Sequence, residues 1–196
     1  YPHDTDREMT LLKFVQAEGR EIGALNWFPV HPTSLTYNNP FVSGDPKGFA
    51  ALEMERRLAV EERGPVVTAF ANSNCGDVTS NLNLDNTGPG ADDLESAGII
   101  GSRQLDVAIA LFDSVSEPLV GRVDIRQTTV EMSRVEVSEQ WTGAGPQQTC
   151  SPARGYSFAA GSTEDGGGNP VFTEGMLEQD ETIDALVRSS LGDEPP

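Results

Sequence analysis

Residues 9–31, MTLLKFVQAEGREIGALNWFPVH, contain two apolar runs separated by a short polar segment. The runs are Met9–Gln16 and Glu21–Val30, and the segment AEGR between them is typical of a tight turn. Short apolar runs joined in this way favour two paired strands over a continuous helix. The pattern therefore predicts a β-hairpin with His31 at its far end.

Signals for a helix and then for a third strand follow the hairpin. Asp45-Pro46 is a typical helix start, because Asp is a good N-cap residue and Pro suits the first helical position. Apolar residues then recur at helical spacing up to Gly64-Pro65, namely Ala51, Met54 and Leu58. Residues 65–71, PVVTAFA, predict a buried strand that enters a polar, turn-rich loop. Loops in such positions often carry functional residues.

The second half of the chain contains the longest helical pattern. Between Asp93 and Pro118, residues step by three and four along one face, at Gly101, Leu105, Ala108, Phe112 and Val115. Residues 123–137 alternate apolar and polar side chains, which predicts one or two long, half-exposed strands. The chain is loop-like after Trp141, and the acidic tail indicates one more short helix containing Ile183, Leu186 and Val187.

The order of these elements indicates the fold class. Strands that alternate with helices predict an α/β fold, with layered mixed β-sheets flanked by helices. The 196 residues are enough for one ordinary domain and too few for two well-sized cores. We therefore expect residues 1–196 to belong to a single domain.

The charge of the chain limits its partners. With 13 Lys plus Arg against 31 Asp plus Glu, the formal net charge is −18. Such a surface repels phosphate backbones and anionic lipid headgroups, which argues against nucleic acid as a partner. No window approaches the roughly 20 apolar residues of a membrane span, so no transmembrane segment is expected. Cys75 and Cys150 are compatible with two thiols, one disulfide, or a disulfide to another segment.

His31 is the first candidate for chemistry. A neutral imidazole held rigidly at the end of a strand loses little entropy when it binds zinc. The alternative is a structural histidine bonded to the backbone, and the pattern by itself favours that alternative. Zinc needs three or four ligands, and the other histidine of the chain is His3, near its start.

Two loops provide further candidates. Residues 73–81, SNCGDVTSN, could present a hydroxyl and backbone N–H groups to a developing oxyanion, as amide hydrolysis requires. Composition by itself favours an ordinary turn in this loop. Residues 149–168 contain Glu164 and Asp165, which could bind a cation or face water, and we interpret these two acids as a solvated loop.

Six stretches of the sequence together resemble the neutral ceramidase family, zinc-dependent amidases that split ceramide into sphingosine and a fatty acid. They lie in the family's order between Glu8 and Gly168 and cover most of the chain. The stretches are EMTLLKFV, GALNWFPVHPTSL, NNPFVSGDPKGFAALEME, VVTAFANSNCGDVTSNLN, IIGSRQLDVA and CSPARGYSFAAGSTEDGGG. Agreement in one such motif arises easily by chance, whereas six in register do not.

The resemblance implies a metal role for His31. The family's NW-x-x-VHP-x-S segment carries a zinc-binding histidine, and that histidine corresponds to His31. The family's other ligands are a histidine of an upstream His-x-His segment and a Glu and a Tyr further downstream, and none has a counterpart in this sequence. We therefore expect the chain to be the central portion of a ceramidase-like catalytic domain. The upstream metal-binding segment and a C-terminal immunoglobulin-like domain are expected outside it, with the remaining zinc ligands supplied by other segments.

The resemblance also implies a catalytic hydroxyl. The family's essential serine lies in a G-[DN]-x-S-P-N loop, where this sequence has Thr79 at the serine and Ser80 at the proline. Threonine keeps the hydroxyl but adds a methyl group that restricts χ1. Thr79 is therefore the expected catalytic residue, and Ser80 is the second choice if the loop shifts by one residue. Backbone N–H groups around Gly76 and Asp77 are expected to contribute to the oxyanion or substrate-binding site.

The implied reaction is hydrolysis of the ceramide amide bond. Water activated by Zn²⁺ attacks the carbonyl, while Thr79 or Ser80 stabilises charge or passes a proton. An apolar groove walled by Trp27, Phe28 and Phe70 would accommodate the lipid chains. The resemblance of Cys150 to a family cysteine whose partner lies beyond this chain implies a secreted or extracellular protein, with association to the cell surface left open. Two alternatives stay open: a lipid-binding relative that has lost catalysis, and a hydrolase of another N-acyl lipid amide.

Overall fold

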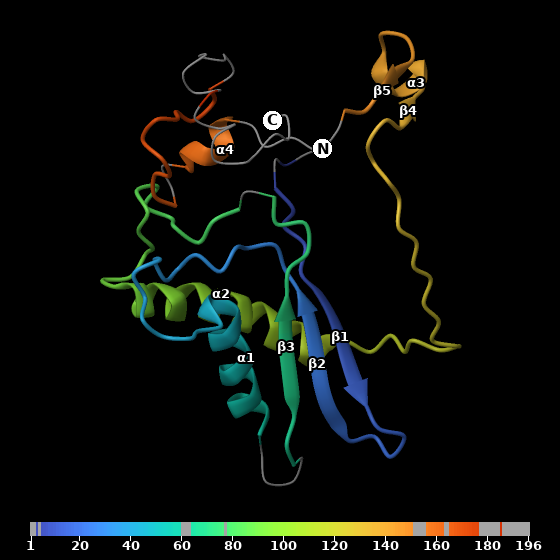
Figure 1. Ribbon diagram of the computed structural model, residues 1–196. Helices are drawn as coiled ribbons and strands as arrows, with labels where there is room; N and C mark the ends of the chain where they lie inside the picture. Colours follow the sequence, from blue (N-terminus) through green and yellow to red (C-terminus); the bar gives the residue numbers. More distant parts are fainter. Residues whose placement is uncertain are drawn as a thin grey trace. The chain divides into compact units, whose positions relative to one another are not determined.

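The computed structural model describes residues 3, 5–59, 64–76, 78–150, 156–162, 165–176 and 185 (Figure 1). The described residues form two compact units. The first comprises those up to Glu117 together with Asp165 and Gly166, and the second comprises those from Pro118 to Ser162 and from Gly167 onward. Each unit is considered separately below. No helix of the described residues is long and apolar enough to cross a membrane.

The first unit is built on a mixed three-stranded sheet. Its strands are β1 (Thr10–Val15), β2 (Glu21–Trp27) and β3 (Val67–Ala71), in the order β1-β2-β3. β1 and β2 are antiparallel, and the turn between them contains Gly19 at a φ of +87°, which glycine adopts without strain. β3 pairs with β2 in parallel. The predicted hairpin is confirmed, although β2 ends at Trp27 and His31 lies in the loop beyond it.

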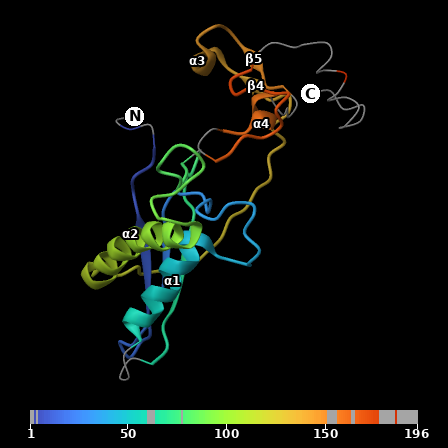
Figure 2. The same cartoon turned by 90° about the vertical axis from the view of Figure 1, so that its left-hand side faces the viewer.

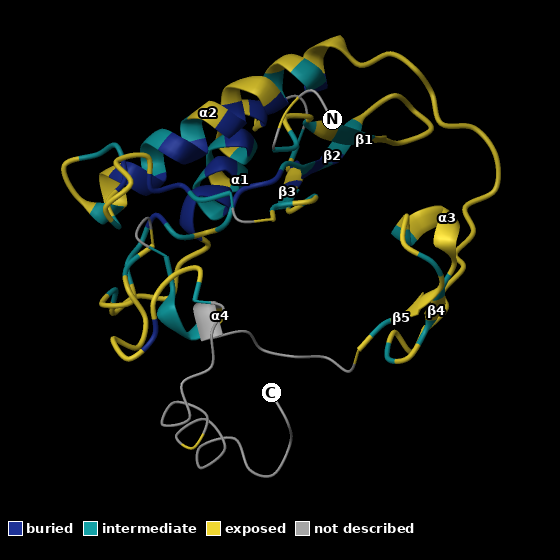
Figure 3. Ribbon diagram, turned by 90° about the horizontal axis from the view of Figure 1, so that it is seen from above, coloured by how far each residue is buried: buried dark blue, intermediate teal, exposed yellow. Residues whose placement is uncertain are grey.

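Two helices, α1 (Asp45–Leu58) and α2 (Asp93–Ser114), cover one face of the sheet (Figures 1 and 2). Most of the side chains predicted to share a face form the core, where Met54, Leu105 and Phe112 are 1% exposed or less. The exceptions are Ala51, which is only partly buried, and Val115, which follows the end of α2 and is 39% exposed. Figure 3 shows the buried stripes of both helices. The helical spacing therefore identified the core face correctly. Sheet and helices together confirm the predicted α/β class.

The crossing of α1 and α2 depends on Gly101. A Cβ atom at Gly101 would lie 2.6 Å from the Pro46 carbonyl oxygen and 2.7 Å from the Phe49 ring. A Cβ atom at Gly98, one turn earlier in α2, would meet nothing closer than 3.8 Å. The two glycines thus share a helix but differ in the space available to a methyl group.

We expect opposite effects from alanine at these two glycines. Gly101→Ala overpacks the helix contact and lowers the free energy of unfolding by about 1–3 kcal/mol. Gly98→Ala raises it by about 0.5–1 kcal/mol, because alanine favours a helix interior. Denaturant unfolding of the two variants measures both values, and equal effects would contradict this account of the crossing.

Lys47 links the helices to the ends of the strands. Its Nζ donates to the carbonyl oxygens of Phe28 at 2.8 Å and Ala71 at 3.1 Å, and to Gln104 Oε1 at 3.4 Å. Burial lowers the pKa of Lys47 to about 8, and the nearby Cys75 opposes this change by favouring the charged ammonium. A charged amine is therefore held in the core next to the loops that follow β2 and β3.

The lowered pKa predicts a pH dependence of stability. Between about pH 8 and 10.5 the unfolded chain binds a proton at Lys47 that the folded chain has released, so stability rises with pH in this window. Across this window the free energy of unfolding rises by up to about 3 kcal/mol. Below pH 8 Lys47 is protonated in both states, so it adds no pH dependence there. Unfolding midpoints across the window should rise more in the wild type than in Lys47→Met. Parallel pH profiles would contradict the prediction.

Three local predictions for the first unit need correction. Asp45 does not cap α1: the N-cap is Gly44, and the Asp45 side chain accepts from the Leu35 N–H at 2.9 Å instead. α1 ends at Leu58, well before Gly64. β3 is buried on one face only, since Val67 is 70% exposed and β3 lies at an edge of the described sheet. Tertiary contacts decided all three points.

The strands predicted over residues 123–137 are wrong. Only β4 (Glu136–Val137) forms there, and it pairs with β5 (Gln147–Gln148). The side chains of Val123 and Ile125 are 97% and 83% exposed. Alternation selects a face, but a strand also needs a neighbour to accept its hydrogen bonds, and the described residues provide one only for β4.

The described residues of the second unit also contain two short helices. They are α3 (Glu139–Thr142) and α4 (Tyr156–Ala160), in a region expected to be loop-like. The predicted helix of the acidic tail lies almost entirely outside the described residues.

Candidate functional site

The loops that follow β2 and β3 carry the predicted site residues. Because the two strands are parallel, their carboxyl ends lie at the same edge of the sheet, and the two loops leave it side by side. The Phe28 N–H donates to the Ala71 carbonyl at 3.1 Å, and the His31 N–H donates to the Val78 carbonyl at 3.0 Å. The fold thus brings His31 next to the segment that contains Thr79 and Ser80.

Two acidic residues at the starts of the helices anchor the first loop. Asp45 Oδ2 accepts from the Leu35 N–H, and Asp93 Oδ2 accepts from the Thr36 N–H and hydroxyl, each at 2.9 Å. Burial raises the pKa of Asp45, and the Leu35 amide opposes the rise by stabilising the carboxylate. The segment from His31 to Thr36 is therefore attached to both helices and to the second loop.

His31 is half-buried, and both ring nitrogens have defined neighbours. Nδ1 lies 3.1 Å from the Val78 carbonyl oxygen, which can only accept, so Nδ1 carries the hydrogen. Nε2 is then the nitrogen with a lone pair, and it lies 3.8 Å from Cys75 Sγ. A histidine that donates one N–H to a backbone carbonyl has the usual orientation of a metal ligand.

The described residues fit a metal at His31 in part. The separation of Nε2 and Cys75 Sγ, 3.8 Å, is close to the roughly 3.6 Å expected between nitrogen and sulfur ligands of one tetrahedral zinc. No group of three His, Cys, Asp or Glu side chains suited to a metal occurs among the described residues. His31 can therefore be one ligand, and further donors would have to come from outside the described part.

Thr79 and Ser80 lie in different surroundings. Ser80 is 1% exposed and accepts from the Ser34 hydroxyl at 3.0 Å, with Thr33 Oγ1 at 3.3 Å. Thr79 is half-buried and its hydroxyl donates to Asp165 Oδ1 at 2.5 Å. Thr79 is thus the more accessible hydroxyl, whereas Ser80 belongs to an enclosed cluster.

Asp165 is the residue that sequence reasoning missed. Asp165 is exposed, as the interpretation of this segment as a solvated loop expected, but its Oδ1 also accepts from Asn81 Nδ2 at 2.8 Å and from the Thr79 hydroxyl. The contact spans more than 80 residues of sequence. No local pattern around Asp165 indicates this pairing, since the motif is equally suited to water or a cation.

Of the other predicted residues, Gly76 lies in the turn before Thr79. Gly76 has a φ of +48°, and the Val78 N–H donates to the Cys75 carbonyl across this turn at 2.8 Å. Asp77 lies outside the described residues. Glu164, the second acid of the later loop, lies outside them as well. Cys75 and Cys150 are both free thiols.

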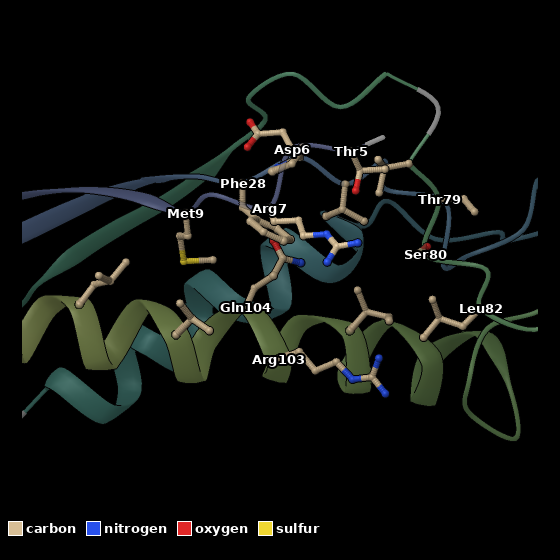
Figure 4. A pocket seen from close by; sticks show the side chains of 16 residues that line it. Thr5, Asp6, Arg7, Met9, Phe28, Thr79, Ser80, Leu82, Arg103 and Gln104 are labelled. Carbon is tan, nitrogen blue, oxygen red and sulfur yellow. The ribbon is translucent and has the colours of Figure 1, made fainter. Parts of the chain in front are cut away.

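A pocket of about 560 Å³ opens beside the two hydroxyls (Figure 4). Its walls are mainly apolar and include Phe28, one of the three aromatic residues expected to form a groove. Phe70 packs against the core instead. Gln104 points from α2 into the pocket below Phe28 and Arg7, and its Nε2 is buried without a partner among the described residues. The pocket therefore has mainly apolar walls, and a buried amide donor without a partner among the described residues lies at one of them.

Comparison with known proteins identifies the family. The family model for neutral/alkaline non-lysosomal ceramidase, N-terminal, matches residues 1–196. The chain belongs to this family. The neutral ceramidase of Pseudomonas aeruginosa is 38% identical over 176 residues, and that of Drosophila melanogaster is 33% identical over 210 residues. Each alignment covers 89% of the chain, but 26% and 30% of the relative, so this ceramidase-family chain spans about a quarter to a third of their length.

Solved structures of ceramidases share the fold. A ceramidase complexed with C2 matches 97% of this chain and 29% of its own, with a TM-score of 0.76 and 36% identity. A crystal structure of neutral ceramidase from Pseudomonas aeruginosa matches 91% of this chain and 28% of its own, with a TM-score of 0.64 and 30% identity. The α/β architecture of this ceramidase-family chain is therefore that of the family.

Proposed function

We propose that the protein containing this chain is a zinc-dependent amidohydrolase that splits ceramide into sphingosine and a fatty acid. Family membership supports the reaction class. One structural observation carries the proposal for this chain: the His31 ring and backbone are both bonded to the Val78 carbonyl, immediately before Thr79. The expected metal ligand and the expected catalytic hydroxyl thus lie on adjoining segments beside an apolar pocket.

The residues of this chain have separate tasks in the proposal. His31 holds the metal through Nε2, and the Val78 carbonyl keeps the ring in the required tautomer. A bound zinc ion would polarise the amide carbonyl and lower the pKa of water. Thr79 hydrogen-bonds to the reacting groups from its half-buried position. Gly76, in the preceding turn, and Asp77, outside the described residues, are proposed to contribute backbone N–H groups to the oxyanion or substrate-binding site.

The pocket suits one apolar chain of the substrate. A lipid chain gains about 0.8 kcal/mol for each CH₂ group removed from water. The buried Gln104 Nε2 would satisfy its hydrogen-bonding capacity on a substrate oxygen. An N-acyl lipid supplies both an apolar chain and such oxygens.

Threonine in place of the family serine supports a second candidate. A catalytically altered, lipid-binding relative would keep the pocket but not the turnover. A hydrolase of another N-acyl lipid would differ from a ceramidase only in the headgroup of the substrate that it cleaves.

Zinc content and hydrolysis separate these candidates. We expect the purified protein to contain zinc, to release fatty acid from N-acylsphingosine faster than from an N-acyl amino acid, and to lose turnover upon chelation. Lipid binding without turnover would favour the altered relative.

We further propose that the protein is secreted and that other segments of the same protein supply the missing zinc ligands. The resemblance of Cys150 to a family cysteine with a partner beyond this chain supports an oxidising compartment. Assay of the culture medium for the protein tests this location. Retention of all the protein inside the cells would contradict it.

A further inference from the structure

We infer that Asp165 is a positioning residue that holds the Thr79 hydroxyl in one orientation for the reaction. The inference rests on the proposed function, because it assigns a task to Asp165 through Thr79. The sequence marks Asp165 only as a loop acid that could bind a cation or face water, and its pairing with Thr79 follows from contacts alone.

The contacts form a closed ring of hydrogen bonds. Thr79 Oγ1 donates to Asp165 Oδ1 at 2.5 Å, and Asn81 Nδ2 donates to the same oxygen at 2.8 Å. The Asn81 backbone N–H in turn donates to Thr79 Oγ1 at 3.1 Å. Asn81 is 2% exposed, so its side chain is held by the surrounding fold. The carboxylate is therefore attached to a rigid partner as well as to the hydroxyl that it orients.

The ring determines which part of the Thr79 hydroxyl faces the reacting groups. A hydroxyl has one hydrogen and two lone pairs. The hydrogen is directed at Asp165, and one lone pair accepts from Asn81. Thr33 Oγ1 lies 3.1 Å from the Thr79 oxygen, but it is also 3.3 Å from Ser80 and can bond there instead. The second Thr79 lone pair is then available to a donor such as the O–H of the attacking water.

Loss of the carboxylate charge should release this orientation. A neutral amide oxygen accepts the Thr79 hydrogen less strongly than a carboxylate, so the hydroxyl would also rotate toward other acceptors and its lone pair would be directed less consistently at the donor. Misplaced reacting groups commonly reduce turnover by about 10²-fold without weakening substrate binding. The expected signature is thus a change in kcat rather than in KM.

The test replaces Asp165 in the intact protein. Asp165→Asn keeps the size of the side chain but removes its charge, and we expect kcat to fall by about 10- to 100-fold while KM stays within about twofold. Zinc content should not change, because Asp165 does not contact His31 in the described structure. Asp85→Asn is the matched control: Asp85 is exposed like Asp165, and its Oδ1 also accepts a threonine hydroxyl, that of Thr87 at 2.5 Å, but Thr87 is not a predicted site residue. Its kcat should equal that of the wild type.

A double-mutant cycle separates positioning from a structural role. Thr79→Val removes the hydroxyl at nearly constant volume, so Asp165→Asn should have less than about a twofold further effect on kcat in that background. An equal loss in both backgrounds, an unchanged kcat, or a loss of zinc in Asp165→Asn would overturn the inference.

Failure of the proposed function gives a different result. A wild-type protein that hydrolyses no N-acyl lipid overturns the proposed function, and the unfolding midpoints of the same four proteins then test the contact. Non-additive midpoints support the Thr79 and Asp165 pair, and additive midpoints overturn it.

Discussion

His31→Ala is expected to lower the zinc content of the intact protein from about one ion per molecule to nearly none, and ceramide turnover by at least about 10³-fold. The His31 ring presents Nε2 while Nδ1 is bonded to the Val78 carbonyl, so this side chain is oriented for a metal before one binds. Removal of one ligand from a site of three or four leaves an ion that exchanges readily. Metal analysis after dialysis, together with kcat, measures both effects.

The control for this prediction is the other histidine of the chain. His3 is exposed and lies outside the site, so His3→Ala should keep both zinc and turnover. Full zinc content in His31→Ala would contradict the metal role. Normal zinc content with lost turnover would instead assign His31 to the reacting groups.

Thr79→Val is expected to lower kcat by about 10²- to 10³-fold, because it removes the hydroxyl proposed to contact the reacting groups. Thr79→Ser, which keeps the hydroxyl, should retain most of the activity. Ser80→Ala should leave kcat within about threefold and lower the free energy of unfolding by about 1 kcal/mol, because the Ser34 hydroxyl loses its buried partner. Steady-state kinetics and denaturant unfolding of the three variants measure these differences.

This comparison decides between the two hydroxyls that the sequence left open. A large loss of kcat in Ser80→Ala with normal kinetics in Thr79→Val would show that the loop shifts by one residue in the active protein. A similar loss in both variants would indicate that the hydroxyl cluster acts as a unit.

Local patterns predicted the elements that pack against a nearby face. The spacing of Leu105, Ala108 and Phe112 identified the buried face of α2, because helical periodicity and burial coincide when a helix lies on a core. The same logic failed for most of residues 123–137, where alternation was present but the described residues provide a neighbouring strand only for Glu136–Val137. Periodicity shows which side chains of a segment could be buried on one face, whereas strand pairing depends on whether another strand lies close enough to form hydrogen bonds.

The candidate site divides in the same way. His31 and Thr79 were found through motifs that the family shares, since a short run of residues carries both the chemistry and its backbone setting. Asp165 and Gln104 were not identified from the sequence. Asp165 belongs to the candidate site because its Oδ1 accepts the Thr79 hydroxyl, and Gln104 because its amide lies at the pocket. No window of sequence contains both partners of such a contact.

The sequence by itself determined the hairpin, the two main helices, the family resemblance and the residues that could bind a metal or carry a hydroxyl. Those properties depend on side-chain type and on spacing within about 20 residues. Only the tertiary structure decided that His31 lies against Val78, that Ser80 is enclosed while Thr79 is accessible, and that Asp165 orients toward Thr79. The physical reason is that hydrogen bonds act over about 3 Å in space, whatever the number of residues between the partners.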